Sequence, residues 1–163
     1  MRVVSNTSPL SNLAIIGRLE LLEDQFGTVW TPRAVSEELG RLEHRRAQEA
    51  LLAARESNWL KEQRLENKNW AEVLSGQLDR GEAEAIALGM EMGADWVLMD
   101  ERDGRLVARQ AGLKVTGVLG VLLKAKQKGQ LGSLQAEIHR LREEARFFIR
   151  KDLEAEILDA AGE

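Results

Sequence analysis

The stretch Asp95-Trp96-Val97-Leu98-Met99-Asp100-Glu101-Arg102-Asp103 decides the fold prediction for this chain. Its short apolar run, Trp96 to Met99, is typical of a strand buried on both faces of a parallel sheet. The run ends at acidic residues, and open parallel sheets bind their ligands beyond the carboxyl ends of the strands. Carboxylates at Asp100 and Asp103 would repel each other there unless a cation such as Mg²⁺ or Mn²⁺ binds them. The alternative interpretation is a solvated turn after a strand.

The composition bounds the class of protein. A chain of 163 residues fits one domain, residues 1–163, and its 44% hydrophobic and 31% charged shares are ordinary for a globular protein. The absence of cysteine excludes disulfides and thiolate metal sites, and the two histidines argue against a histidine-based zinc site. The ligands expected for a metal are therefore carboxylate and amide oxygens.

Hydropathy and net charge indicate where the protein is located and whether it attracts nucleic acid. No apolar stretch reaches the roughly 20 residues of a membrane span, and the first residues lack the apolar core of a signal peptide, so we expect a cytoplasmic protein. The net charge of −4 gives no overall attraction to nucleic acid. A nucleic-acid ligand would therefore need local basic patches or bound cations to offset phosphate repulsion.

Strands and helices alternate along the predicted chain, which favours a parallel sheet. Strands are expected at 2–5, 28–30, 96–99 and 113–116, and residues 58–65 are compatible with an edge strand. Helices are expected at 9–23, 32–55, 69–77, 81–90, 105–111 and 118–128, and two more begin near Ser133 and Asp152. The last two have the spacing of a helical hairpin added to the sheet domain.

Three further polar side chains are predicted to reach the carboxyl edge of this sheet. Asn6 follows the first strand, and Glu38 lies on the shoulder of an apolar helix face. Glu82 lies in the middle of a buried helix face, where an acid is costly unless it is paired or bound to metal. A carboxylate that stabilises the helix start is the alternative for Glu82. Joint placement of these residues with Asp100 and Asp103 favours a site for a hard dication.

At these residues the chain resembles the PIN-domain family of metal-dependent ribonucleases. The resemblance rests on four ordered segments: Val3–Leu10, Thr31–Leu39, Gly81–Ile86 and Leu98–Asp103. It implies a three-layer α/β/α fold with a central parallel sheet of four or five strands. The core would cover about residues 2–118, and a C-terminal helical hairpin about 118–161.

The resemblance also implies roles for the candidate residues. Its catalytic acids correspond to Glu38, Glu82, Asp100 and Asp103, and its metal ligands, for Mg²⁺ or Mn²⁺, to the same four with Asn6. Thr7 or Ser8 corresponds to a hydroxyl that assists the metal site. Asn6 departs from the family, whose first ligand is an acid. An amide oxygen can bind a hard cation but brings no charge, so it should weaken the metal site.

The function expected from the resemblance is metal-dependent endoribonuclease activity that hydrolyses RNA phosphodiester bonds. A role as the toxin of a toxin–antitoxin pair, an antitoxin partner and a homodimer or higher oligomer are further expectations. Arginines that could bind the RNA backbone, each also compatible with a solvated helix face, are Arg41, Arg45, Arg46, Arg102 and Arg105.

Three other functions fit parts of the pattern. Asn6 favours a non-catalytic domain that binds nucleic acid or a partner and has a weakened metal site. Relatives of the fold can also act on DNA flaps. A response-regulator-like phosphoacceptor would place acids at strand ends too, but it needs a lysine near the end of the last strand, and Lys114 comes before that end.

Overall fold

The computed structural model, which describes residues 1–163, has one five-stranded sheet in which every neighbouring pair of strands is parallel. The strand order is β3-β2-β1-β4-β5. The strands are β1 Val3–Ser5, β2 Val29–Thr31, β3 Leu60–Glu62, β4 Trp96–Leu98 and β5 Val115–Thr116. The predicted α/β fold with a parallel central sheet is therefore confirmed, and β3 is the edge strand that residues 58–65 suggested.

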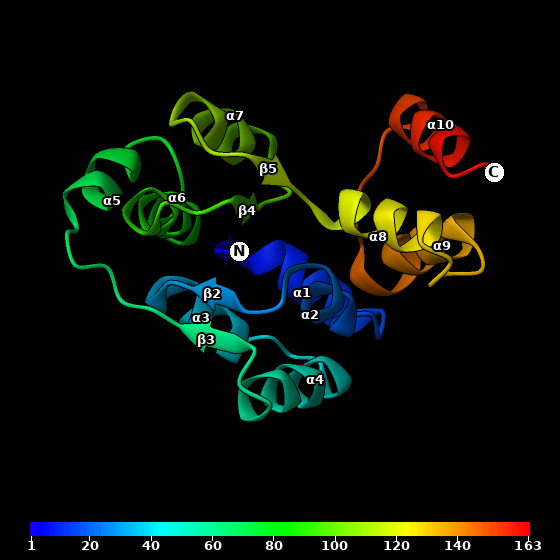
Figure 1. Ribbon diagram of the computed structural model, residues 1–163, viewed down its shortest axis with the longest axis horizontal. Coiled ribbons are helices and arrows are strands. Elements are labelled where there is room, and N and C mark those ends of the chain that lie inside the picture. The colour runs from blue at the N-terminus through cyan, green and yellow to red at the C-terminus, as the bar shows by residue number, and fades with distance from the viewer.

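Helices cover both faces of the sheet (Figure 1). They are α1 Thr7–Ile15, α2 Glu20–Phe26, α3 Arg33–Gly40, α4 Arg45–Glu56, α5 Asn69–Leu74, α6 Arg80–Met92, α7 Arg102–Gln110, α8 Val118–Gln127, α9 Leu134–Ala145 and α10 Lys151–Ala160. None of them combines the length and apolarity needed to cross a membrane.

Side-chain alternation along the strands divides the core into two layers. Val3 and Leu98 belong to the larger apolar cluster, which includes residues of α1, α2, α8 and α9, whereas Val4 and Val97 belong to the smaller one under α5, α6 and α7. Successive residues of a strand point to opposite faces. The apolar runs in β1 and β4 are therefore buried on both sides, and the polar residues that follow them emerge together at the carboxyl edge.

Two predicted helices are each interrupted. The expected helix 9–23 is wrong as a single element, because the chain turns at Gly17 with a left-handed φ of 72° before α2 begins. The expected helix 32–55 is also wrong, because α3 ends at Gly40 and α4 restarts at Arg45. His44 caps the second segment, since its Nδ1 accepts a hydrogen bond of 3.1 Å from the Ala47 amide.

The C-terminal helices gather around α8 at one end of the molecule (Figure 1). Both α9 and α10 contact α8, and an ion pair between Arg142 and Glu154 connects α9 to α10. Leu141 and Ile149 are buried in the larger cluster. They contribute to the core, whereas Phe148 is strongly exposed, at 83%.

Candidate metal centre

Strand pairing places the ends of β1 and β4 side by side. Ser5 is in register with Leu98, and the Asn6 amide donates a 2.9 Å hydrogen bond to the Leu98 carbonyl. Asn6 is buried, with 3% of its surface exposed. Its side-chain Nδ2 donates to Glu101 Oε2 at 3.2 Å, and the Ser8 hydroxyl donates to the other oxygen of Glu101. The first and fourth sequence segments therefore meet at Glu101.

Glu101 is the site residue that the sequence interpretation missed. It lies between the two predicted acids, Asp100 and Asp103. Glu101 is the residue before the first turn of α7, and its extended backbone (φ −68°, ψ 133°) accompanies a side chain that reaches Asn6 and Ser8. Because the sequence pattern predicts the helix only from residue 105, no signal indicated an inward role for Glu101, whereas α7 begins at Arg102.

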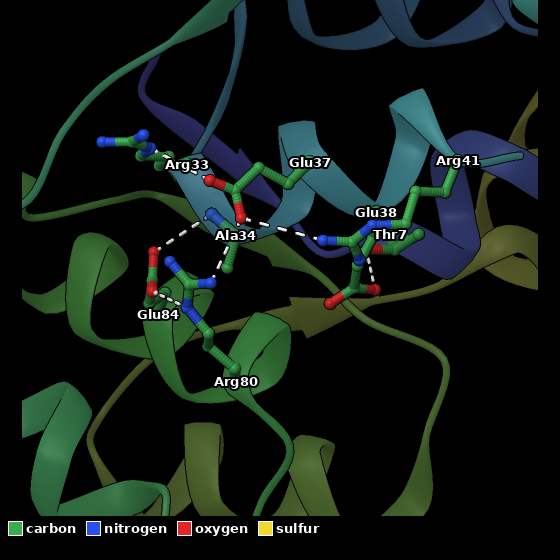
Figure 2. Close-up of polar contacts among 8 residues, drawn as sticks. All are labelled: Thr7, Arg33, Ala34, Glu37, Glu38, Arg41, Arg80 and Glu84. Carbon is green, nitrogen blue, oxygen red and sulfur yellow. Dashed lines mark hydrogen bonds and ion pairs between the residues drawn. The ribbon is translucent and has the colours of Figure 1, made fainter.

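The hydroxyl of Thr7 and the absence of a side chain at Gly81 together position Glu38 beside Asn6. The Thr7 Oγ1 donates to Glu38 Oε2 at 2.7 Å, and Figure 2 shows this contact beside α3. A Cβ atom added to Gly81, in the first turn of α6, would overlap Glu38 Oε1 and lie 3.4 Å from Asn6 Oδ1. Glycine at position 81 therefore leaves the space in which an oxygen of Glu38 and one of Asn6 approach each other.

An ionic network fastens α3 to the start of α6 (Figure 2). Glu37 pairs with Arg33 at 3.0 Å and with Arg80 at 3.1 Å, and Arg80 pairs with Glu84 at 3.0 Å. The hydrogen bond from Arg33 lowers the pKa of Glu37, as do the neighbouring arginine charges. The network fixes the helix that carries Glu38 against the helix that carries Gly81.

Glu82 has the buried position that its helix face predicted, with 7% exposure. It also takes part in a capping box with Asp79. The Glu82 amide donates to Asp79 Oδ1 at 2.8 Å, and the Asp79 amide donates to Glu82 Oε2 at 3.1 Å. Burial raises the pKa of Glu82, and the charges of Asp79, Glu101 and Asp103 raise it further. Glu82 is thus both a helix cap and an electrostatic neighbour of the acids at the edge.

Asp100 and Asp103 differ in environment. Asp100 Oδ1 accepts a 2.8 Å hydrogen bond from the Val118 amide at the start of α8. Its Oδ2 is buried and has no partner within hydrogen-bond distance, although the Asn12 side chain lies near enough to lower the pKa of the carboxyl. Burial, with a further contribution from the charge of Glu101, raises the pKa of Asp100 to about 6. Asp103 is exposed in the first turn of α7, near enough to raise the pKa of Glu82.

The unpartnered oxygens indicate what the edge can bind. Asn6 Oδ1 and Asp100 Oδ2 are both buried without a hydrogen-bond partner, and a buried polar atom of this kind calls for a ligand. Both are hard oxygens of the kind that suits Mg²⁺ or Mn²⁺. Asn6 is linked to Glu101 through its Nδ2, and Asp100 precedes Glu101 in the chain. No three Asp, Glu or His side chains are gathered as a ready-made metal cluster. Of the five predicted residues, only Asn6 hydrogen-bonds to Glu101, whereas Glu38 and Glu82 are held by Thr7 and Asp79.

The structure also locates the predicted RNA-binding arginines and the lysine of the phosphoacceptor alternative. Of the arginines, Arg41 lies 3.9 Å from Glu37 and Arg45 pairs with Glu49, whereas Arg102 and Arg105 belong to α7 beside Asp100. Lys114 extends over the Trp96 ring, 5.9 Å from its centre. The lysine that a phosphoacceptor would need is therefore occupied elsewhere.

The raised pKa of Asp100 predicts a pH-dependent stability for the metal-free protein. The ordinary pKa is 3.8, so between about pH 4 and pH 6 the folded state retains a proton that the unfolded state has lost. This residue should therefore stabilise the fold at low pH, and that stability should be lost as the pH rises through 6. At 1.36 kcal/mol for each pKa unit the loss is about 3 kcal/mol.

The measurement is urea unfolding in EDTA from pH 4 to pH 8, wild type beside Asp100→Asn. We expect the variant to be more stable than wild type above pH 6 and the difference to vanish near pH 4. A difference that does not change with pH would show that burial does not perturb Asp100.

A parallel sheet with helices on both faces, and with acids and a buried amide at its carboxyl edge, defines an α/β protein. A family model described as a PIN domain matches residues 2–163, and the chain therefore belongs to the PIN-domain family. PIN domains are generally nucleases that bind nucleic acid and use divalent metal ions.

A solved structure supports the fold. It is a PilT N-terminus domain protein, SSO1118, from the archaeon Sulfolobus solfataricus P2, with a TM-score of 0.55 and 15% identity. The match covers 82% of this chain and 96% of the archaeal one. No curated protein matches the sequence.

Proposed function

We propose that this protein is a metal-dependent endoribonuclease that hydrolyses RNA phosphodiester bonds. The observation that carries the proposal is that two residues at the carboxyl edge, Asn6 and Asp100, each have a buried oxygen without a hydrogen-bond partner, Oδ1 and Oδ2 respectively. A nuclease of this family needs oxygens free to bind a cation, and most other polar atoms here have a protein partner. The general activity of PIN domains supports the same assignment.

The proposed ligands of Mg²⁺ or Mn²⁺ are Asn6, Asp100 and Glu101, with Glu38, Glu82 and Asp103 around them. A bound dication would lower the pKa of a water molecule and offset the charge that develops on the phosphate. Thr7 holds Glu38 by one oxygen and leaves the other free to accept a proton from attacking water. Arg102 and Arg105 would offset the phosphate charges on the side of α7.

Glu101 supports activity despite the amide at position 6. The Asn6 amide donates to Glu101, which an aspartate could not do, so the negative charge that Asn6 lacks is supplied by its neighbour. The competing proposal is a non-catalytic PIN domain that binds nucleic acid or a partner through a weakened metal site. A cytoplasmic location, an antitoxin partner and a homo-oligomer stay predictions from the sequence, and light scattering measures the oligomeric state.

The test is an assay on total RNA with Mg²⁺, with Mn²⁺ and with EDTA, beside single-stranded DNA and a DNA flap. We expect RNA cleavage with either metal, none in EDTA, and much weaker action on DNA. Cleavage that persists in EDTA would contradict the proposal. Binding of RNA and of Mn²⁺ without cleavage would favour the non-catalytic domain, and preference for the flap would favour a DNA nuclease.

A further inference from the structure

A second feature extends from the metal site along α7. A cleft of about 770 Å³ begins at Asp100 and runs between α7, the start of α8 and the chain around the start of α10. Figure 1 shows that an extended segment carries the chain from α9 to α10, which lies beside α8. Because Asp100 lines both the cleft and the proposed metal site, a strand bound at the site could continue into the cleft.

The walls of this cleft are strongly basic. Its charged lining residues are Asp100 and four arginines, Arg102, Arg105, Arg109 and Arg150, of which Arg150 alone is in an ion pair, with Asp152. The whole chain, by contrast, has a net charge of −4. The cleft therefore has the local basic patch that an acidic protein needs in order to bind a polyanion.

The arginines of α7 form one stripe. Arg102, Arg105 and Arg109 are separated by three and four residues, which places them on the same side of a helix. None of the three is in an ion pair with an acid within 4.0 Å, whereas eight other arginines are. Arg105 Nη1 donates a 2.8 Å hydrogen bond to the Met99 carbonyl, and like charges at this spacing repel one another. A row of phosphates would relieve the repulsion.

An aromatic side chain stands on the opposite wall. Arg146 ends α9 in a left-handed conformation with φ 53°, and Ile149, with 6% exposure, returns the chain to the core. Phe148 lies between these two anchors and is 83% exposed. An exposed ring beside arginines is the arrangement on which unpaired bases stack in proteins that bind single strands.

We propose that the cleft binds a single-stranded flank of the RNA substrate, with its phosphates along Arg102, Arg105 and Arg109 and a base stacked on Phe148. The assignment of the ligand as RNA rests on the proposed nuclease function. The C-terminal segment thus contributes to substrate binding in addition to completing the core.

The first test measures the binding of a fluorescent 12-nucleotide oligouridine by anisotropy in EDTA, where cleavage is blocked. Arg102→Ala/Arg109→Ala should bind about tenfold or more weakly, and the slope of log affinity against log salt should fall by about 1.4, about 0.7 for each phosphate contact. The matched control, Arg55→Ala/Arg64→Ala, removes the same charge from exposed positions outside the cleft. It should change the affinity by no more than about twofold.

The second test addresses stacking. Phe148→Ala should weaken binding of the single strand by about 5- to 150-fold, whereas Phe148→Trp should retain it. Duplex RNA, whose bases are not free to stack, should bind both variants equally. Because Phe148 is exposed, the thermal midpoints of both variants should stay near that of wild type.

The cleft inference and the nuclease proposal can each be contradicted without the other. Weaker binding by Arg102→Ala/Arg109→Ala and Phe148→Ala supports the cleft even if wild type cleaves no RNA, which would reject only the nuclease. Affinity equal to wild type in both, or no binding of oligouridine by wild type, would overturn the inference even if wild type cleaves RNA.

Discussion

Asp100→Asn is expected to lower the rate of metal-dependent RNA cleavage by about a hundredfold or more. The change removes one negative charge and one oxygen from the proposed metal site, and even outer contacts of a metal site typically contribute 10- to 100-fold. The fold should survive, because an asparagine Oδ1 can still accept the hydrogen bond from the Val118 amide. The variant should therefore lose activity while it gains stability above pH 6.

The measurement is the initial rate of RNA cleavage in Mn²⁺, with thermal unfolding of the same samples. Asp159→Asn is the matched control, because Asp159 is exposed on α10 and its side chain makes no hydrogen bond or ion pair. It should cleave as wild type does. Equal rates for Asp100→Asn and wild type would remove Asp100 from the site and, with it, the proposed mechanism.

Gly81→Ala should also impair cleavage, by about tenfold to a hundredfold, although it adds only a methyl group. That methyl group would displace the Glu38 carboxylate from its place beside Asn6 and strain the Thr7 hydrogen bond. A displacement of about 1 Å in a catalytic group can cost a hundredfold in rate. Stability should change little, because alanine favours the helix and the flexible end of Glu38 can move.

Steady-state rates and urea unfolding of Gly81→Ala separate these effects. Gly40→Ala, at the end of α3, is the control, since nothing lies within 4 Å of the Cβ that it would add. It should leave the rate unchanged. Full activity in Gly81→Ala would show that the position of Glu38 beside Asn6 has no part in catalysis.

Much of the fold could be predicted because apolar runs report burial directly. The runs of β1 and β4 are buried on both faces, and this is why Asn6 and the acids after β4 share one edge. Periodicity likewise gave the buried face of Glu82. The periodicity could not predict that the chain turns at Gly17 and before His44. The apolar pattern continues across each turn, from α1 into α2 and from α3 into α4.

The centre of the site could not be predicted, because it depends on side-chain direction over long separations. Glu101 meets Asn6 and Ser8 across 95 and 93 residues, and no local pattern reports such contacts. The sequence also could not show that most of the acids have their own donors. Glu38 accepts from Thr7, Glu82 from the Asp79 amide and Asp100 from the Val118 amide. These donors offset the repulsion that the sequence attributed to a cation alone.

The measurement that bears most directly on the metal site is a crystal soaked in Mn²⁺ and examined by anomalous scattering. We predict a manganese peak at the carboxyl edge of β1 and β4, in contact with Asp100 and with at least one of Asn6 and Glu101. Manganese bound only at other acids, such as Glu37, or no manganese at all, would contradict a metal-dependent nuclease built on these residues.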